Sequence, residues 1–112
     1  MFQMLSCFNL KPGVDLAAFE TALCAFSDHM VAQGLIRGTG PVMRRQSDTQ
    51  LDTDTDRGHS FFFLTDFRDK AQSDAAFAYL ESGSEPGFSR HRAVMAQTID
   101  PIFICWERPG PG

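Results

Sequence analysis

The sequence has no long apolar run and no excess of basic residues. Its longest apolar stretches are far shorter than the roughly 20 residues that a membrane-spanning helix needs, and its first residues lack the charged and apolar pattern of a leader. Lys and Arg number 10 against 14 Asp and Glu, a formal net charge of -4. Such a chain has no basic field for nucleic acid or anionic lipid. We therefore expect neither a nucleic acid nor a membrane as a partner.

Cysteine and histidine are also scarce, with three residues of each. An odd number of cysteines without framework spacing favours a reducing compartment, so the expected location is the cytoplasm. None of these residues recurs at a spacing typical of a metal site, such as i and i+4 on a helix. The sequence therefore predicts no structural metal from Cys7, Cys24, Cys105, His29, His59 and His91.

Hydrophobic periodicity predicts four strands and three helices within one domain, residues 1–108. Asp15 is a plausible N-cap of the first helix, Gly34 fits its end, and Asp69 with Gln72 resembles a capping box for the second. The Pro-Gly tail at 109–112 is expected to be flexible. The predicted strands cover 2–10, 35–46, 59–67 and 102–107, and the helices run from 16 to about 33, from 70 to about 82, and from 86 to just before 100.

One predicted strand carries four consecutive bulky apolar residues, Phe61-Phe62-Phe63-Leu64. Because side chains alternate along a strand, both faces of this strand must be hidden from water. If helices cover one face of the sheet, something else must cover the other. The sequence thus predicts either a second copy of the chain or a bound small apolar molecule on that face.

The order strand, helix, strand, strand, helix with a short extra helix, strand is the ferredoxin-like β-α-β-β-α-β arrangement. It predicts an α+β fold with a fully antiparallel sheet and the helices on one face. In that topology the strand at 59–67 lies in the middle of the sheet. The apolar run is therefore placed where a dimer would bury it.

With this arrangement the chain resembles the dimeric α+β barrel superfamily, and most of all a bacterial family of ferredoxin-like proteins of unknown function. The resemblance implies a homodimer. It does not choose a function, because the superfamily includes heme-degrading oxygenases, cofactor-free monooxygenases, small dehalogenase-like and cyclase-like enzymes, and stress-responsive proteins. The matching segments are 10–15, 34–36, 67–72, 74–77 and 91–94.

Candidate site residues follow from their positions on the predicted strands. His59 begins the central strand, where an imidazole could border the cavity and exchange protons with water as a general base. Arg44 and Arg45 are adjacent on the second strand and must point to opposite faces, so one of them could hold a carboxylate or enolate oxygen. The remaining predicted ligand-binding residues are Phe61, Phe63 and Trp106.

The acidic segment 52–58 alternates aspartate with threonine, as the start of an EF-hand loop does. It lacks the glycine at the sixth position and the glutamate at the twelfth, where Arg57 and Phe63 stand instead. The segment is therefore predicted to be a solvated hairpin connection that does not bind calcium.

Three functions remain open from the sequence. The first is a binding module whose sheet-lined cavity holds a small apolar or aromatic molecule. The second is a cofactor-independent monooxygenase or isomerase with His59 as base and an arginine as oxyanion partner. The third is a stress-responsive structural protein without catalysis. The heme-degrading relatives would place an axial ligand at a helix histidine, His29 or His91, but neither lies in a matching context, so no cofactor is expected.

Overall fold

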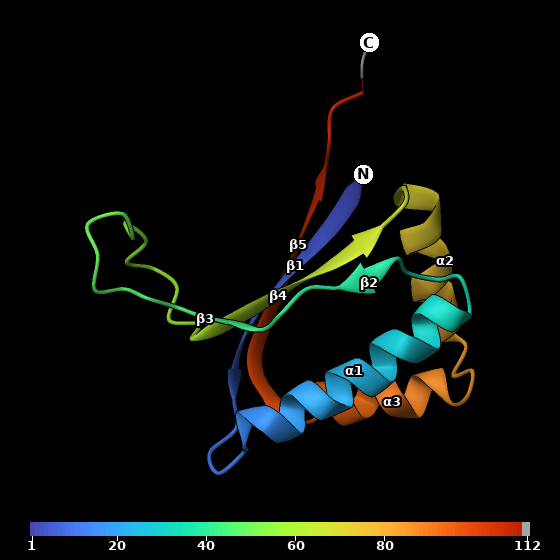
Figure 1. The fold of residues 1–112 in the computed structure, drawn as a ribbon, viewed down its shortest axis with the longest axis horizontal. Helices are drawn as coiled ribbons and strands as arrows, with labels where there is room; N and C mark the ends of the chain where they lie inside the picture. The colour runs from blue at the N-terminus through green and yellow to red at the C-terminus, as the bar shows by residue number, and fades with distance from the viewer. Residues whose placement is uncertain (111–112) are drawn as a thin grey trace.

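The computed structural model describes residues 1–110 and consists of a five-stranded antiparallel sheet with three helices on one face (Figure 1). The sheet order is β2-β4-β1-β5, and β3 also pairs with β4. No helix in this part of the chain is long and apolar enough to cross a bilayer. The elements are β1 (Phe2–Leu10), α1 (Leu16–Ala32), β2 (Gly38–Thr39), β3 (Met43–Arg44), β4 (Phe61–Phe67), α2 (Lys70–Glu81), α3 (Gly87–Met95) and β5 (Thr98–Glu107).

The first strand and helix lie close to where the sequence predicts them. Alternation along β1 places Ser6 and Phe8 on the side of the helices, where both are buried. The Asp15 side chain accepts a hydrogen bond from the amide of Ala17 and so caps α1. Gly34, with φ of 71°, follows the helix in the left-handed conformation that glycine adopts readily. Local chemistry thus fixes both ends of α1.

The core lies between the sheet and the helices and consists of two clusters. One joins Phe8 to Phe63 and to side chains of α1 and α3, and the other joins Met30 to Phe67 and α2. The half-buried Phe26 packs against both clusters. The fully buried members are large, so the helix side of the sheet holds most of the hydrophobic stabilisation. The buried core residues are Phe8, Phe19, Leu23, Met30, Ile36, Phe63, Phe67, Ala76 and Val94.

Strand β4 is apolar on both faces, as the sequence predicts. Phe63 points to the helices and is buried. Phe62 pairs with Cys7 and Leu64 pairs with Leu5, so both lie on the opposite face of the sheet, which no helix covers. This helix-free side is called the open face below.

The last strand begins four residues earlier than predicted. The third helix was expected to continue to Asp100-Pro101, yet α3 ends at Met95, and β5 runs from Thr98 and pairs with β1 on both sides of this dipeptide. Asp100 adopts φ of 54° and the β1 pairing shifts register between Cys7 and Asn9. The irregularity is therefore absorbed as a bulge that bends the strand, and pairing continues past it.

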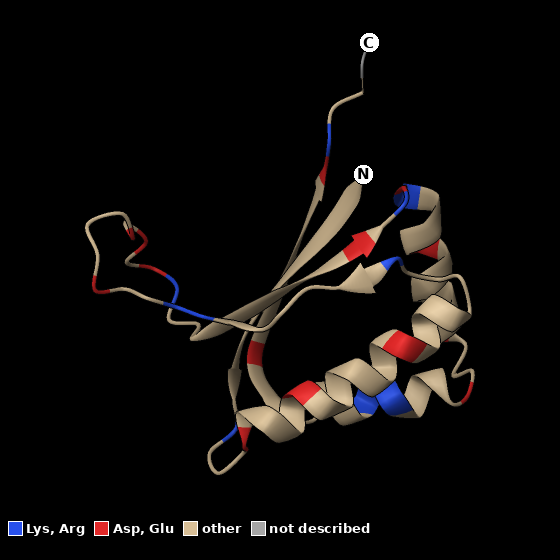
Figure 2. Cartoon of the chain, viewed as in Figure 1, with Lys and Arg blue, Asp and Glu red and all other residues tan. Residues whose placement is uncertain are grey.

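The second predicted strand is divided in two by Gly40-Pro41, giving the short edge strands β2 and β3. After β3 a long segment leaves the sheet and returns at β4, which begins at Phe61 rather than at His59. In Figure 1 this segment, residues 45–60, extends on the side opposite the helices. Figure 2 shows basic and acidic residues along it, whereas the sheet is mostly uncharged.

Of the tail 109–112, residues 109–110 are in neither helix nor strand, and residues 111–112 lie outside the described part.

Candidate functional site

A cleft of about 730 Å³ lies on the open face beneath the segment 45–60. Its floor is apolar and comes from three neighbouring strands, β4, β1 and β5. Its roof is the polar segment, which contributes arginine, aspartate, threonine and one leucine. The cleft therefore joins an apolar surface to a charged one. The floor residues are Leu5, Cys7, Phe62, Ile104 and Trp106.

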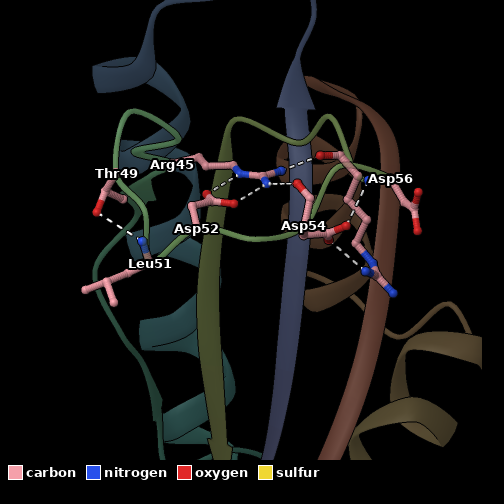
Figure 3. Close-up of polar contacts among 7 residues, drawn as sticks. Arg45, Thr49, Leu51, Asp52, Asp54 and Asp56 are labelled. Carbon is pink, nitrogen blue, oxygen red and sulfur yellow. Dashed lines mark hydrogen bonds and ion pairs between the residues drawn. The ribbon is translucent and has the colours of Figure 1, made fainter.

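Arg45 joins several points of the loop that forms the roof of the cleft (Figure 3). Its Nε and one Nη donate to the two carboxylate oxygens of Asp52, at 2.8 and 2.7 Å. The same guanidinium also donates to the backbone carbonyls of Asp54, at 2.6 Å, and of Arg57. A planar guanidinium suits this arrangement because it presents several donors in a fixed geometry. One side chain thus binds three points of the loop.

A second ion pair closes the other arm of the loop. The Arg57 guanidinium donates to Asp54 at 2.7 Å, and the other carboxylate oxygen of Asp54 accepts from the amide of Asp56 at 2.9 Å. The hydrogen bond from Arg45 lowers the pKa of Asp52, and that from Arg57 lowers the pKa of Asp54. Both ion pairs therefore stabilise the folded loop at pH values above the ordinary carboxyl pKa. This stabilisation is lost as the pH falls through the lowered pKa values of the two carboxyl groups.

The loop is a mostly exposed connection between β3 and β4, and two of its aspartates, Asp52 and Asp54, pair with arginines. The residues described, 1–110, contain no group of three or more His, Cys, Asp or Glu placed to hold a metal ion.

A smaller polar hollow of about 470 Å³ adjoins the cleft at the neck of the loop. Three arginines line it, together with one aspartate, His59 and small polar residues. Arg44 lies over the Phe61 ring, with its guanidinium carbon 5.6 Å from the ring centre. Arg45 instead bonds the loop above the open face, so the two arginines point apart, as strand alternation predicts. The lining residues are Arg44, Arg45, Ser47, Asp54, Arg57, Gly58, His59 and Ser60.

His59 lies just before β4 and lines both the cleft and the polar hollow. Its Nε2 is 2.7 Å from the backbone carbonyl of Asp100. A carbonyl only accepts, so Nε2 carries the proton and Nδ1 of the neutral ring is left as an acceptor. Nδ1 is buried and has no hydrogen-bond partner among residues 1–110. The ring is thus held in one tautomer at the wall of the cleft.

The three predicted aromatic residues lie in different places. Trp106 lies on the open face in the cleft floor and is 60% exposed. Phe61 packs against the core and Phe8 while contributing to the cleft wall. Phe63 is in the core between the sheet and α1, which corrects its prediction as a cavity residue. The alternation of β4 separates Phe63 from Phe62, and it is Phe62 that lines the cleft.

Sequence reasoning missed Cys7 and the loop carboxylates as parts of this site. Cys7 lies in the cleft floor, where burial raises the pKa of its thiol against the lowering effect of Arg57 and Arg45. The two helix histidines lie elsewhere. His29 is 2.8 Å from the hydroxyl of Tyr79, and His91 packs against Phe26, where burial lowers its pKa.

Solved structures with the same fold cover almost the whole chain. The Arabidopsis thaliana protein At3g17210 has a TM-score of 0.74 at 11% identity, covering 100% of this chain and 99% of that one. SnoaB, a cofactor-independent oxygenase from Streptomyces nogalater, has a TM-score of 0.66 at 12% identity, with 97% and 93% covered. A dimeric ferredoxin-like protein of unknown function from Thermobifida fusca has a TM-score of 0.56 at 13% identity, with 94% and 88% covered.

These likenesses, all at low identity, show the ferredoxin-like α+β fold that the sequence predicts. Among sequence families, the model of a family described as of unknown function, DUF6614, matches residues 1–111. No curated protein matches the sequence significantly.

Replacing Arg45 by glutamine should release the loop. The variant loses the guanidinium that binds Asp52 and two carbonyls, so cleavage of the loop by a protease specific for aspartate should become several-fold faster while the helical circular dichroism stays unchanged. Arg37→Gln is the matched control, because Arg37 is exposed and makes no ion pair within residues 1–110. Equal cleavage rates for both variants would show that the Arg45 contacts do not hold the loop.

Proposed function

Because the chain belongs to the DUF6614 family, whose function is unknown, we propose a function from the cleft itself: the protein binds a small apolar or aromatic molecule between the sheet and the loop. The observation that carries this proposal is the apolar floor on the open face, roofed by an ion-paired loop. Ligand pockets are typically concave and mostly apolar with a few placed polar groups, which is the composition found here.

We propose further that a second copy of the chain covers the rest of the open face. Three large apolar side chains are exposed on this side: Met43 at 48%, Trp106 at 60% and Leu51, in the loop, at 91%. Contiguous apolar surface of this kind favours an interface. Related folds support the proposal, since the Thermobifida fusca protein is described as dimeric. A partner sheet would turn the open cleft into an enclosed one.

The free cysteines support the cytoplasmic location expected from the sequence. Cys7, Cys24 and Cys105 form no disulfide with one another. The location itself stays a prediction.

A neutral apolar probe tests the binding proposal. N-phenyl-1-naphthylamine should gain fluorescence on titration with the protein and should quench the single tryptophan, Trp106, which lies in the cleft floor. Ile104→Ser removes apolar contact from the floor and should weaken binding about tenfold.

The control is the neighbouring residue on the same strand. Phe103 points to the other face of β5 and is 49% exposed, so Phe103→Ser should leave the affinity unchanged. Equal loss in both variants, or no binding by the wild type, would count against the cleft as the binding site.

Phe62 and Phe63 give a paired test of the dimer. Phe62→Asp puts a charge on the open face and should yield a folded monomer by sedimentation, with the emission of Trp106 shifted to the red. Phe63→Asp buries an unpaired charge in the core and should cost several kcal/mol, unfolding the chain. A wild-type chain that sediments as a monomer at micromolar concentration would refute the proposed dimer.

A second candidate function is a cofactor-independent monooxygenase or isomerase with His59 as the base. The position of His59 at the cleft wall supports it: the carbonyl of Asp100 holds Nε2, so Nδ1 is the basic nitrogen, and because Nδ1 is buried the ring would have to turn to reach a substrate. Arg44 and Arg57 line the same hollow and could stabilise developing negative charge. The likeness in fold to a cofactor-independent oxygenase supports this candidate.

Oxygen uptake tests the enzyme candidate. Anthrone carries an acidic CH₂ group, and its oxidation by dioxygen to anthraquinone releases one water. If His59 removes the first proton, wild-type protein should accelerate oxygen consumption, and His59→Gln should lose about 100-fold or more of that acceleration. No acceleration by the wild type, or an equal rate with His59→Gln, would remove His59 as base. If no probe binds either, the third reading, a structural protein without catalysis, gains support.

A further inference from the structure

We propose that the exposed Leu51 of each chain packs on the apolar open face of a second copy, as a paired contact that joins the two chains. This inference rests on the proposed dimer and adds which residue makes the contact. It is carried by the exposure of Leu51, by the hydrogen bonds that fix its position, and by the apolar face on the same side of the chain.

Leu51 is the most exposed large apolar side chain among residues 1–110, at 91%. It lies at the rim of the cleft and points away from the ion pairs of the loop (Figure 3). Its own chain therefore leaves it in water, although burial of such a side chain is favourable. A single exposed leucine is ordinary on a protein surface, so its setting in the loop decides whether it has a role.

The loop holds Leu51 in a fixed place. Residues 49–52 form a turn, because the amide of Asp52 donates to the carbonyl of Thr49 at 3.2 Å. The amide of Leu51 donates to the hydroxyl of Thr49 at 3.3 Å. Asp52, the next residue, is held by two nitrogens of Arg45. A side chain fixed in this way loses little conformational freedom on association, which favours its use in an interface.

The matching surface lies on the same side of the chain. The loop extends on the side opposite the helices, and this is also the side of the open face (Figure 1). The sheet there is apolar, and two of its large side chains, Trp106 and Met43, remain exposed. One side of the chain thus carries both a projecting apolar side chain and an apolar surface that could receive one.

A second copy satisfies both features at once. An interface with two-fold symmetry is self-complementary, so the projecting leucine and the apolar face are each buried twice when two identical chains meet. A different partner would have to supply a surface matched to each feature separately. The related fold from Thermobifida fusca, which is described as dimeric, also favours a second copy as the occupant.

Sedimentation of two loop variants tests this inference. Leu51→Asp should raise the dimer dissociation constant about 100-fold, because burial of one leucine is worth about tenfold in affinity and a symmetric interface contains it twice. Thr55→Asp is the matched control, since Thr55 is exposed in the same loop, lines neither hollow and receives the same charge. Its dissociation constant should stay within about twofold of the wild-type value. Both variants should keep the helical circular dichroism.

A tryptophan placed at position 51 reports on the contact directly. In a Trp106→Phe background, Leu51→Trp carries the only indole of the chain. Its emission should be blue-shifted in the dimer and should move to the red on dilution, in step with dissociation measured by sedimentation. The control is Glu20→Trp in the same background, because Glu20 is exposed on α1, on the helix side of the sheet. Its emission should stay red at every concentration.

The outcomes separate this contact from the proposed dimer. If the wild type is a dimer and Leu51→Asp weakens it no more than Thr55→Asp does, the contact is refuted while the dimer stands. Red emission from the tryptophan at position 51 in a chain that sediments as a dimer refutes the contact in the same way. A wild-type chain that stays monomeric at micromolar concentration refutes the dimer, and the contact with it.

Discussion

The structure depends on one constraint, that the central strand β4 is apolar on both faces. A single layer of helices cannot bury both faces, because successive side chains of a strand point in opposite directions. The helices cover Phe63 and Phe67, which are buried. Phe62 and Leu64 are left to the open face, where only the loop lies over part of the sheet. The division of the sheet into a packed helix side and an open face follows from this strand.

The two sides are held by different forces. The helix side is packed with large apolar side chains, so its stability responds to buried area and volume. The loop is held by hydrogen bonds and ion pairs at the surface, which salt and acid weaken. Arg45 donates to three loop residues at once, and the ion pair of Arg57 with Asp54 holds the other arm of the roof. None of these contacts involves a residue of the buried core.

The sequence predicts what periodicity and local capping determine. The bounds of β1, the cap at Asp15 and the stop at Gly34 are all correct, because each depends on neighbours in the chain. The predicted start of β5 was wrong, because α3 ends at Met95, before the Asp100-Pro101 dipeptide expected to stop it, and a bulge lets the strand pair on both sides of that dipeptide. The contacts of Arg45 join residues 7 to 12 positions apart in a polar loop. No hydrophobic period marks such contacts, so only the folded chain reveals them.

The comparison with other folds explains why the same limit applies to function. A chain 11% identical reaches a TM-score of 0.74, so the fold requires the order and periodicity of apolar residues and few particular side chains. The residues that line the cleft are not part of that requirement: Arg44, Arg45 and His59 lie at the neck of the loop, outside the buried core. A related chain can therefore keep the packing of its helix side while the side chains at this neck differ. The function of the family is therefore to be sought in the loop and in the open face beneath it, because the fold alone does not determine it.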